Sequence, residues 1–495
     1  MSQFLRINKK IKSFNKRISI EGDKSLSIRW ALLASQAIGK SRAYKILKSE
    51  DVLSTINCLK KLGVKAKFKN NYCEIIGKGL NSYNYKNNLI LNAGNSGTLG
   101  RLILGLLVHS KKKIKIIGDK SLSKRDFSRI SKPLEKFGAK FYSNKKNKLP
   151  LSIMGPEKTV PINYIENKGS AQCKSSVMLA ALNTKGTTFI KAKKSRNHTE
   201  LLFQYLKVPI KIKKTKKFDY IKIKGIKKIQ SFNYTIPADI SSSSFFIVLT
   251  ALSENSRLLI KNVNINPTRT GIIKILKSMG VKILIKNKKN YQGDKLADIF
   301  VKSSKNIKAI NCPPSLNSSS IDEFLIIFLV AARAKGISYF KELSELNQKE
   351  SPRLSWGSKI LNMMGVKTKL TNHSIKIYGD PKLKLTKPIK IKNYLKDHRI
   401  FMMSTVAALT VGGEWKIYNL DSIKSSFPTF LKIIKDLNGK KKYKIKVAID
   451  SPAAAGAGTQ AKLISKYYNL FYLDTGKIYR LIANIKIKWP LKYNY

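Results

Sequence analysis

The sequence predicts an α/β protein built from six repeated helix–strand–helix–strand units, three in each of two lobes. Three observations support this fold class. An almost uniformly apolar helix followed by an alternating strand recurs six times. An amphipathic helix, usually with a further short strand, follows each copy. Units of roughly 70 residues fill the chain to about residue 438, as in proteins assembled from internal repeats.

The first helix of each unit is apolar on all sides. Such a helix has to be enclosed by other elements, because no face of it suits water. We therefore expect three buried helices inside each lobe. The helix-and-strand segments occupy residues 28–46, 98–117, 174–192, 243–261, 322–341 and 399–418.

The second helix of each unit has one apolar face. In the second unit, apolar residues follow each other at steps of three and four, which places them in one stripe that faces a core. They are Phe127, Ile130, Leu134 and Phe137. A glycine such as Gly138 usually follows, as expected where a helix ends in the left-handed conformation.

The repeats also predict where the chain divides. The third unit ends and the fourth begins near residues 234–239. We therefore expect one lobe at 22–237 and a second lobe formed by 1–21 together with 238–438. Residues 439–495 follow the last repeat as a separate segment. Ligands prefer clefts between lobes, so the function should lie there.

The net charge of +69 comes from 97 Lys and Arg against 28 Asp and Glu. Such a charge is typical of proteins that bind nucleic acid or anionic surfaces. Here lysine is spread over nearly every segment together with Ile and Asn, whereas nucleic-acid-binding proteins concentrate it on one face. We therefore do not expect nucleic acid as a partner, and we look for function in the arginines.

Cysteine spacing and hydropathy argue against several classes of protein. The four cysteines are scattered, without CxxC pairs, so neither a zinc site nor a disulfide framework is expected and a reducing cytosol fits. The N-terminus has no apolar stretch of signal-peptide length. The apolar run at 324–332 is far shorter than the ~20 residues that a membrane span needs. We expect a cytoplasmic protein without membrane association.

Five segments of the first lobe combine small residues, hydroxyls and cations at the entrance to a helix. Helix N-termini attract anions, and Lys and Arg strengthen this. In the first segment we expect Ser25 and Ser27 as helix caps and Gly22 in a tight turn. Each segment alone could be a capped helix with solvated bases, but repeat symmetry directs all five to one face. They are EGDKSLSIR (21–29), NAGNSGTLGR (92–101), GDKSLSKRD (118–126), KGSAQCKSS (168–176) and SRNHTE (195–200).

These motifs resemble those of the EPSP synthase (3-phosphoshikimate 1-carboxyvinyltransferase) family. Its bacterial members carry PGDKSxSxR, GNSGTxxR, GDxSLxxRP, SAQxKS, SRDHTE, NPTRTG, IDE, ELxVKESDR, DHRxAM and SFPxF in this order. The sequence has a counterpart of each between about residues 20 and 437. The resemblance implies a two-lobed inside-out α/β barrel of the enolpyruvyl transferase type.

The resemblance implies transfer of the enolpyruvyl group of phosphoenolpyruvate to the 5-hydroxyl of shikimate-3-phosphate, with release of phosphate, in the shikimate pathway to chorismate and the aromatic amino acids. Asp322 would accept the hydroxyl proton, and Lys24 or Glu350 would protonate C3 of phosphoenolpyruvate. Without the resemblance, Asp322 would be interpreted as the cap of an apolar helix. These two small molecules are the expected partners of a monomer, and the reaction requires no metal or organic cofactor.

By position, the resemblance assigns further residues to the two substrates. Two phosphates and two carboxylates share the pocket, and planar arginines recognise both groups bidentately. For shikimate-3-phosphate the residues are Lys24, Ser25, Arg29, Ser170, Ala171, Gln172, Ser195, Arg196, Asp322 and Lys349. For phosphoenolpyruvate they are Lys24, Gly97, Arg125, Gln172, Arg353, Arg399 and Lys424. Family members with Ala at the position of Gly97 resist glyphosate, so we expect this chain to be sensitive.

Several positions depart from the family's motifs. Glu21 replaces a Pro, Asn197 replaces an Asp, and Pro352 replaces the Asp that precedes Arg353. Lys424 is expected to replace a lysine that some members have one position later. The change at Pro352 bears most directly on where the guanidinium of Arg353 points.

Residues 444–483 resemble the start of cytidylate kinase. The loop SPAAAGAGT (451–459) corresponds to GPxGSGKGT, and YLDTGKIYR (472–480) corresponds to YLDTGxxYR. A P-loop holds phosphates with backbone N–H groups and one lysine, and here Ala457 takes the lysine position. The segment is also too short for a kinase domain with its acceptor site. We expect a truncated P-loop kinase-like segment without activity.

Two other functions stay open on the sequence alone. A related enolpyruvyl transferase that acts on a UDP-amino sugar would share the two-lobed fold. That class carries a reactive cysteine near the position of Arg125, and none of the four cysteines lies there. A nucleic-acid-binding protein would use the positive charge, and its retention on a polyanion would fall steeply with salt.

Overall fold

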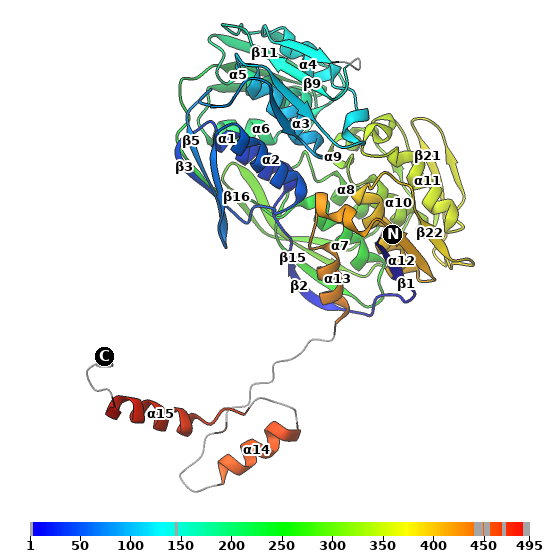
Figure 1. Ribbon diagram of the computed structural model, residues 1–495. Helices are drawn as coiled ribbons and strands as arrows, with labels where there is room; N and C mark the ends of the chain where they lie inside the picture. The colour runs from blue at the N-terminus through cyan, green and yellow to red at the C-terminus, as the bar shows by residue number, and fades with distance from the viewer. Residues whose placement is uncertain (1–2, 144–146, 440–448, 450–455, 468–471, 489–495) are drawn as a thin grey trace. The chain divides into compact units, whose positions relative to one another are not determined.

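The computed structural model describes residues 3–143, 147–439, 449, 456–467 and 472–488. The chain forms two compact units, 1–438 and 439–495 (Figure 1). The first unit contains the six predicted repeats, and each unit is described below by itself.

The first repeat shows the local design. Its elements are α1 (Lys24–Ala34), β3 (Ile38–Tyr44), α2 (Glu50–Lys61), β4 (Lys65–Phe68) and β5 (Tyr72–Lys78). The sheet has the order β14-β3-β5-β4, in which β14 (Asn233–Thr235) is parallel to β3. The predicted helix–strand–helix–strand order is present. The structure adds to it a second hairpin strand after α2 and a parallel strand at the sheet edge.

The second, third and fourth repeats keep this order. The second contains β6 (Leu89–Asn92), α3 (Gly97–Leu107), β7 (Ile114–Ile117), η1 (Leu122–Lys124), α4 (Ser128–Glu135), β8 (Lys140–Ser143) and β9 (Leu151–Met154). The third contains β10 (Asn163–Glu166), α5 (Ala171–Ala181), β11 (Thr187–Lys193), α6 (His198–Tyr205), β12 (Ile210–Lys214) and β13 (Phe218–Lys224). The fourth contains α7 (Ile240–Leu252), β15 (Arg257–Asn264), α8 (Gly271–Ser278), β16 (Ile283–Tyr291) and β17 (Asp294–Lys302).

The last two repeats vary the design. The fifth contains β18 (Asn311–Cys312), η2 (Pro314–Leu316), α9 (Asn317–Ser320), α10 (Phe324–Ala332), β19 (Gly336–Phe340), η3 (Ser344–Gln348), α11 (Arg353–Met363), β20 (Thr368–Leu370) and β21 (Ile375–Gly379). The sixth contains β22 (Ile389–Ile391), α12 (His398–Val411), β23 (Trp415–Tyr418), η4 (Leu420–Ser425) and α13 (Phe430–Asn438).

The N-terminal segment completes two distant sheets. Strand β1 (Phe4–Ile7) pairs antiparallel with β23, and β2 (Asn15–Ser19) pairs parallel with β15. The first residues of the chain therefore belong to the sheets of the sixth and fourth repeats. No local pattern predicted these pairings, because the partner strands lie hundreds of residues away along the chain.

The first helix of each repeat is buried, as its composition predicts. All nine residues of α10 are buried, and strands β3 and β5 lie at the outer edge of the unit while α1 lies inside (Figure 1). The buried apolar side chains form two clusters. We call the cluster from residues 26–236 the first core and the cluster from 11–20 and 238–437 the second core.

The amphipathic helices also follow their pattern. The four stripe residues of the second repeat, Phe127 to Phe137, are fully buried. Gly63, Gly138, Gly280 and Gly365 all have a positive φ where these helices end. The helix termini were therefore correctly predicted from glycine placement.

The chain passes between the two cores at two adjacent places. Gly22 and Ala238 form an antiparallel bridge, and the backbone N–H of Asp23 donates to the carbonyl of Pro237 at 2.8 Å. A Cβ on Gly22 would lie 2.2 Å from the carbonyl oxygen of Lys45. Gly22 is therefore required by a close backbone approach, and the predicted tight turn is not its reason.

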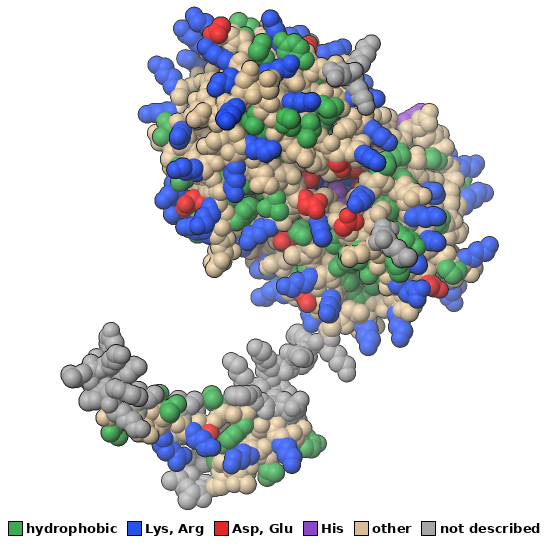
Figure 2. Space-filling view, viewed as in Figure 1, with side chains coloured by type: hydrophobic (Ala, Val, Ile, Leu, Met, Phe, Trp, Pro, Cys, Tyr) green, Lys and Arg blue, Asp and Glu red, His purple; other side chains and the backbone are tan. Residues whose placement is uncertain are grey.

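Lys and Arg side chains are spread over the whole visible face of the larger unit, and acidic side chains gather near its middle (Figure 2). This distribution fits the even spread of lysine along the sequence. Among the described residues, no helix is both long and apolar enough to cross a membrane.

In the second unit the structure describes α14 (Ala457–Tyr467) and α15 (Thr475–Lys488). No residue of α14 is buried, and Leu463 is 62% exposed. Most of the loop that resembles a P-loop, namely its residues 451–455, lies outside the described residues. Ala457, at the lysine position of that loop, is the first residue of α14.

Candidate functional site

The helix entrances of the first core are capped by side chains. Ser96 caps α3 by accepting the N–H of Leu99, and Ser170 caps α5 by accepting the N–H of Cys173. At α1 the cap is Asp23, whose Oδ1 accepts the N–H of Leu26 at 2.8 Å. The prediction that the serines of 21–29 cap this helix was wrong, because a carboxylate one position before the helix is the stronger acceptor.

Arg29 joins three helices of the first core. Its Nε donates to Thr199 Oγ1 at 2.8 Å, and Nη2 donates to Ser175 Oγ at 3.2 Å. Nη1 donates to the hydroxyl and carbonyl oxygens of Ser25. Burial lowers the pKa of Arg29 to about 10, so the side chain stays a cation at neutral pH.

Lys24 begins α1 and forms an ion pair with Asp51 at the start of α2, with 2.9 Å between Nζ and Oδ2. Burial raises the pKa of Asp51, whereas the neighbouring ammonium lowers it. The Lys24 side chain is the more exposed partner, at 20% against 7% for the Asp51 side chain. It is therefore held in place and still accessible.

Gln172 links α5 to α3. Its side-chain oxygen accepts from Arg101, and its Nε2 donates to Thr98 Oγ1 at 3.0 Å. Burial, with the nearby charge of Arg125, lowers the pKa of Arg101 to about 10. The resemblance assigned Arg101 to neither substrate, although it closes the GNSGTxxR motif and could have been found there.

Gly97 and Arg125 are in direct contact. A Cβ on Gly97 would lie 2.6 Å from Nη1 of Arg125. The other terminal nitrogen of Arg125 lies 3.4 Å from Oε1 of Glu350, a residue of the second core's half of the chain. The hydroxyl of Ser121 also donates to the carbonyl of Glu350, at 3.1 Å.

Asp322 collects cations from both halves. Its carboxylate lies 2.6 Å from Arg196, 3.4 Å from Lys349 and 3.4 Å from Arg353. These charges hold the pKa of Asp322 well below its usual range despite burial. The carboxylate is not a helix cap, because Glu323 takes the position before α10 without a side-chain cap bond.

Arg353 keeps a defined direction although Pro352 precedes it. Its Nε lies 2.8 Å from Asp397, Nη2 contacts Glu350, and the side chain is 2% exposed. Burial raises the pKa of Glu350, but the charges of Arg353 and then Arg125 hold it well below its usual range. Asp397 was not assigned a role from the sequence, although the DHR motif that contains it was recognised.

Arg399 and Lys424 differ in their setting. Nη1 of Arg399 donates to the backbone carbonyl of Asp322 at 2.8 Å and lies 3.9 Å from Glu323. Lys424 is exposed in η4, which contacts α2. The hydroxyl of Ser425, the next residue, lies 3.4 Å from His398 Nδ1. Ser425 therefore contacts a residue of the same half of the chain.

Some buried donors among the candidate site residues have no hydrogen-bond partner among the described residues. Within the described part of the chain, the Nε atoms of Arg125 and Arg196 and the hydroxyl of Ser195 are buried without a hydrogen-bond partner. Ala171 is the first residue of α5. Unpaired buried guanidinium nitrogens favour a phosphate or carboxylate guest.

The comparisons with known proteins identify the family of the chain. The sequence model of EPSP synthase (3-phosphoshikimate 1-carboxyvinyltransferase) matches residues 8–434. The chain belongs to the EPSP synthase family. Its relatives include the 3-phosphoshikimate 1-carboxyvinyltransferases of Thermoanaerobacter sp. (strain X514) and of Bacillus subtilis (strain 168). The first is 40% identical over 84% of this chain and 96% of its own, and the second is 34% identical over 87% and 99%.

Solved structures agree as well. The EPSP synthase of Acinetobacter baumannii has a TM-score of 0.77 at 33% identity and covers 89% of this chain and 98% of its own. The enolpyruvyl transferase NikO from Streptomyces tendae reaches a TM-score of 0.70 at 13% identity, which shows the fold alone. The predicted enolpyruvyl transferase fold is confirmed. A cytidylate kinase model matches residues 447–492, so the predicted resemblance of the tail is confirmed too.

Two residues that depart from the EPSP synthase motifs make side-chain hydrogen bonds. The amide oxygen of Asn197 accepts from Asn266 at 2.8 Å and from Thr268 at 3.1 Å. Glu21 accepts from the hydroxyl of Thr429 at 2.9 Å. The contacts of Asn197 join the two halves of the chain, whereas the contact of Glu21 lies within one of them.

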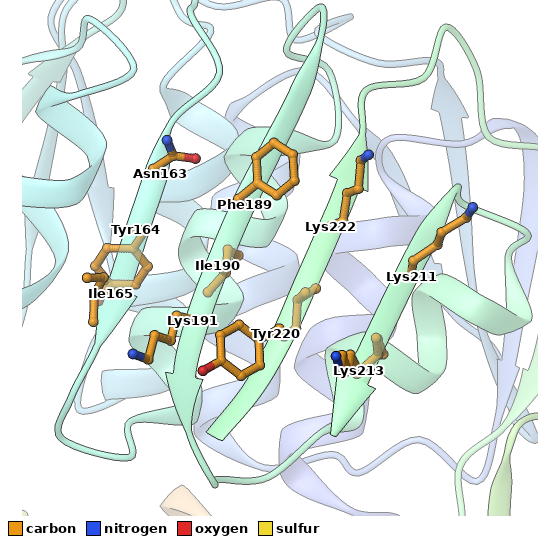
Figure 3. A pocket seen from close by; sticks show the side chains of 12 residues that line it. Asn163, Tyr164, Ile165, Phe189, Ile190, Lys191, Lys211, Lys213, Tyr220 and Lys222 are labelled. Carbon is orange, nitrogen blue, oxygen red and sulfur yellow. The ribbon is translucent and has the colours of Figure 1, made fainter. Parts of the chain in front are cut away.

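A cavity of about 500 Å³ lies away from these EPSP synthase motifs, on the exposed side of the sheet β10-β11-β13-β12 (Figure 3). Phe189 and Tyr220 stand there among lysines such as Lys191 and Lys222. None of its lining residues is one of the predicted site residues. This sheet face, lined by flexible lysine stems, offers no convergent set of donors, so the charged residues around Asp322 and Glu350 remain the candidate functional site.

Proposed function

We propose that this EPSP synthase transfers the enolpyruvyl group of phosphoenolpyruvate to the 5-hydroxyl of shikimate-3-phosphate and releases phosphate, on the route to chorismate and the aromatic amino acids. The observation that carries the proposal is the convergence of cations from both halves on the carboxylates of Asp322 and Glu350. Substrates with two phosphates and two carboxylates need such a fixed set of cations. Family membership over residues 8–434 supports the same reaction.

We assign shikimate-3-phosphate mainly to the lobe of residues 22–237. Arg29 is fixed by three hydroxyl-bearing residues, and the Nε of Arg196 is buried without a hydrogen-bond partner among the described residues. Lys349 reaches the ring hydroxyls from the other lobe, beside Asp322. The full set is Lys24, Ser25, Arg29, Ser170, Ala171, Gln172, Ser195, Arg196, Asp322 and Lys349.

Phosphoenolpyruvate binds across the lobe boundary, between 22–237 and the lobe of 1–21 with 238–438. Arg125 contributes buried donors from the first lobe, and Gly97 leaves the room that its guanidinium occupies. The full set is Lys24, Gly97, Arg125, Gln172, Arg353, Arg399 and Lys424. Binding would replace the contacts that Arg125 makes with Glu350 and that Arg353 makes with Asp322 and Glu350.

The reaction proceeds by addition and elimination. Asp322, ionised at neutral pH, accepts the 5-hydroxyl proton as the oxygen attacks C2 of phosphoenolpyruvate, and Lys24 donates a proton to C3. Glu350 is held ionised, so it suits the later removal of a proton from the new methyl group. The C–O bond to phosphate then breaks and the enol ether forms. Proton transfer to the leaving phosphate and proton exchange with water return Asp322, Lys24 and Glu350 to their starting protonation states.

Phosphate release from the two substrates tests this function. Asp322→Asn should lower kcat by roughly 10²- to 10⁴-fold, the usual loss when a general base is removed. Asp436→Asn, which changes an exposed carboxylate on α13, is the matched control and should leave kcat unchanged. Wild-type release no faster than that of Asp322→Asn would refute the proposal.

The rival enolpyruvyl transferase reaction is tested in the same assay. When a UDP-amino sugar replaces shikimate-3-phosphate and phosphoenolpyruvate is still present, we expect no phosphate release. Release with the UDP-amino sugar but not with shikimate-3-phosphate would favour the rival reaction. For the tail we propose no kinase activity, supported by Ala457 at the lysine position. Saturable binding of a nucleoside triphosphate to the full chain would contradict this.

We also propose a monomer in the cytoplasm. The four cysteines are free and buried, which fits a reducing compartment. Sedimentation at low micromolar concentration tests the monomer.

A further inference from the structure

Arg269 lies where the chain passes between the two cores. It ends the NPTR segment that precedes α8, and its side chain is 3% exposed. No role was assigned to it from the sequence. An arginine buried this deeply is costly unless its charge and donors are satisfied, so its partners indicate what it does.

The guanidinium of Arg269 binds the caps of two buried helices. Nη1 lies 3.0 Å from Oδ2 of Asp23, and Nη2 lies 3.2 Å from Oδ1 of Asp239. Asp23 caps α1 through the N–H of Leu26, and Asp239 caps α7 through the N–H of Ser241 at 2.7 Å. One side chain thus holds the first helix of each core, beside the paired backbone crossings.

The partners of Arg269 also contact the segments that carry Lys24 and Asp322. The backbone N–H of Lys24 donates to Oδ2 of Asp239 at 3.4 Å. On the other side, Nη2 of Arg269 donates to Ser241 Oγ at 2.7 Å, and this hydroxyl donates to Glu323. Glu323 is the residue next to Asp322. Arg269 therefore lies between the start of α1, where Lys24 is the first residue, and the start of α10, which Asp322 precedes.

A planar fork suits this position better than a point charge. Arg269 bonds two carboxylates and a hydroxyl from two nitrogens. A lysine has one nitrogen on a flexible stem and cannot hold both aspartates in a fixed relative position. The two buried carboxylates would also repel each other without the shared cation.

We propose that Arg269 is a positioning residue that fixes the two halves of the active site relative to each other, holding Lys24 and Asp322 at their working separation. The inference rests on the proposed function for its catalytic consequence. Loss of the fork allows the cores to shift about the crossing strands. A misplacement of about 1 Å between reacting groups can cost roughly 10²-fold in rate.

The kinetic test uses the full chain with Arg269→Gln and Arg269→Lys. For Arg269→Gln we expect kcat to fall about 100-fold and KM for phosphoenolpyruvate to rise about tenfold, because that substrate bridges the lobes. The dissociation constant of shikimate-3-phosphate alone, measured by calorimetry, should change less than about threefold. The kcat of Arg269→Lys should exceed that of Arg269→Gln by less than about tenfold.

A matched control separates positioning from stability. Arg333, at the end of α10, is largely buried and donates to the carbonyl of Pro381 within one half of the chain. Arg333→Gln should lower the melting temperature and leave kcat unchanged. If Arg269→Gln only lowers the melting temperature, with kcat and KM within about threefold of the wild type, the proposal is wrong.

A distance measurement keeps the test independent of activity. Spin labels at Lys140→Cys and Lys369→Cys, both exposed and in different halves, report the separation of the cores while the native cysteines stay buried. The distribution should broaden or shift in Arg269→Gln and stay unchanged in Arg333→Gln. An unchanged distance distribution in Arg269→Gln would overturn the proposed positioning role, whatever the enzyme activity. Absence of phosphate release by the wild type would overturn only the proposed function.

Discussion

Replacing Gly97 by Ala is a sharp test of how phosphoenolpyruvate is held. The added Cβ would lie 2.6 Å from Nη1 of Arg125, 3.7 Å from Nη1 of Arg101 and 3.7 Å from Cζ of Arg125. The close atom is the end of a flexible side chain, so the fold can accommodate the methyl group. The guanidinium of Arg125 has to move instead.

The size of the movement follows from the distance. An ordinary contact begins near about 3.4 Å, so the nitrogen has to retreat by about 0.8 Å (3.4 − 2.6 Å). Arg125 also faces Glu350 at 3.4 Å, which limits the directions open to it. Displacement of a substrate-binding group by nearly 1 Å costs up to about 100-fold. We therefore expect KM for phosphoenolpyruvate to rise about 10- to 100-fold, or about 1.4 to 2.7 kcal/mol.

Steady-state phosphate release against each substrate measures the effect. KM for shikimate-3-phosphate should change less than about threefold. Gly100→Ala, on the same helix, is the matched control, because its Cβ would meet other atoms at 3.5 Å or more. It should leave kinetics unchanged and stabilise the helix by up to about 1 kcal/mol. Gly105→Ala would press on the carbonyl of Ser176 at 2.2 Å and should cost about 1 to 3 kcal/mol of stability.

A Gly97→Ala enzyme with an unchanged KM for phosphoenolpyruvate would refute the assignment of Arg125. Equal losses for both substrates would also refute it, since they would indicate general damage to the fold. Glyphosate gives an independent reading. The wild type should be inhibited by millimolar glyphosate, and Gly97→Ala should be inhibited less.

Three further predictions follow from burial. Burial lowers the pKa of His398 to about 3, so the folded protein takes up fewer protons than the unfolded chain between pH 6.5 and 3, and stability falls as the pH falls through this window. Between pH 7 and 5 the free energy of unfolding, measured with urea, should fall by about 2 kcal/mol more in the wild type than in His398→Gln. Burial also raises the pKa of the Cys58 and Cys312 thiols to about 11, so native protein should resist thiol reagents that label it after unfolding; rapid native labelling would contradict the burial. A chain ending at Gly439 should keep its kcat and unfold within about 0.5 kcal/mol of the full chain, because 1–438 is a compact unit. A large loss in either would show that the tail supports the enzyme.

Much of the fold was predictable because its signals are local. A helix apolar on every side has to be enclosed, and α10 is buried along its whole length. A stripe at steps of three and four predicts one buried face, and a following glycine predicts the left-handed end, as at Gly138. The order of the motifs was sufficient to predict the family.

The pairing of strands was less predictable. Strand β1 at Phe4–Ile7 joins β23 at Trp415–Tyr418, and the second hairpin strand of the first five repeats was not expected. Short alternating segments specify which face is buried, but they do not specify which distant strand becomes the neighbour.

For the site, the sequence by itself determined the types of residue and their places at helix entrances. Only the tertiary structure decided their partners: Asp23 as the cap of α1, Asp397 as the partner of Arg353, and Arg269 between two caps. The physical reason is the range of the forces involved. Helix periodicity and end signals depend on neighbours within a few residues, whereas a buried charge is satisfied by whichever opposite charge the folded chain brings within about 4 Å. Asp322 illustrates this difference, since its sequence neighbours suggested a helix cap and the fold surrounded it with Arg196, Lys349 and Arg353.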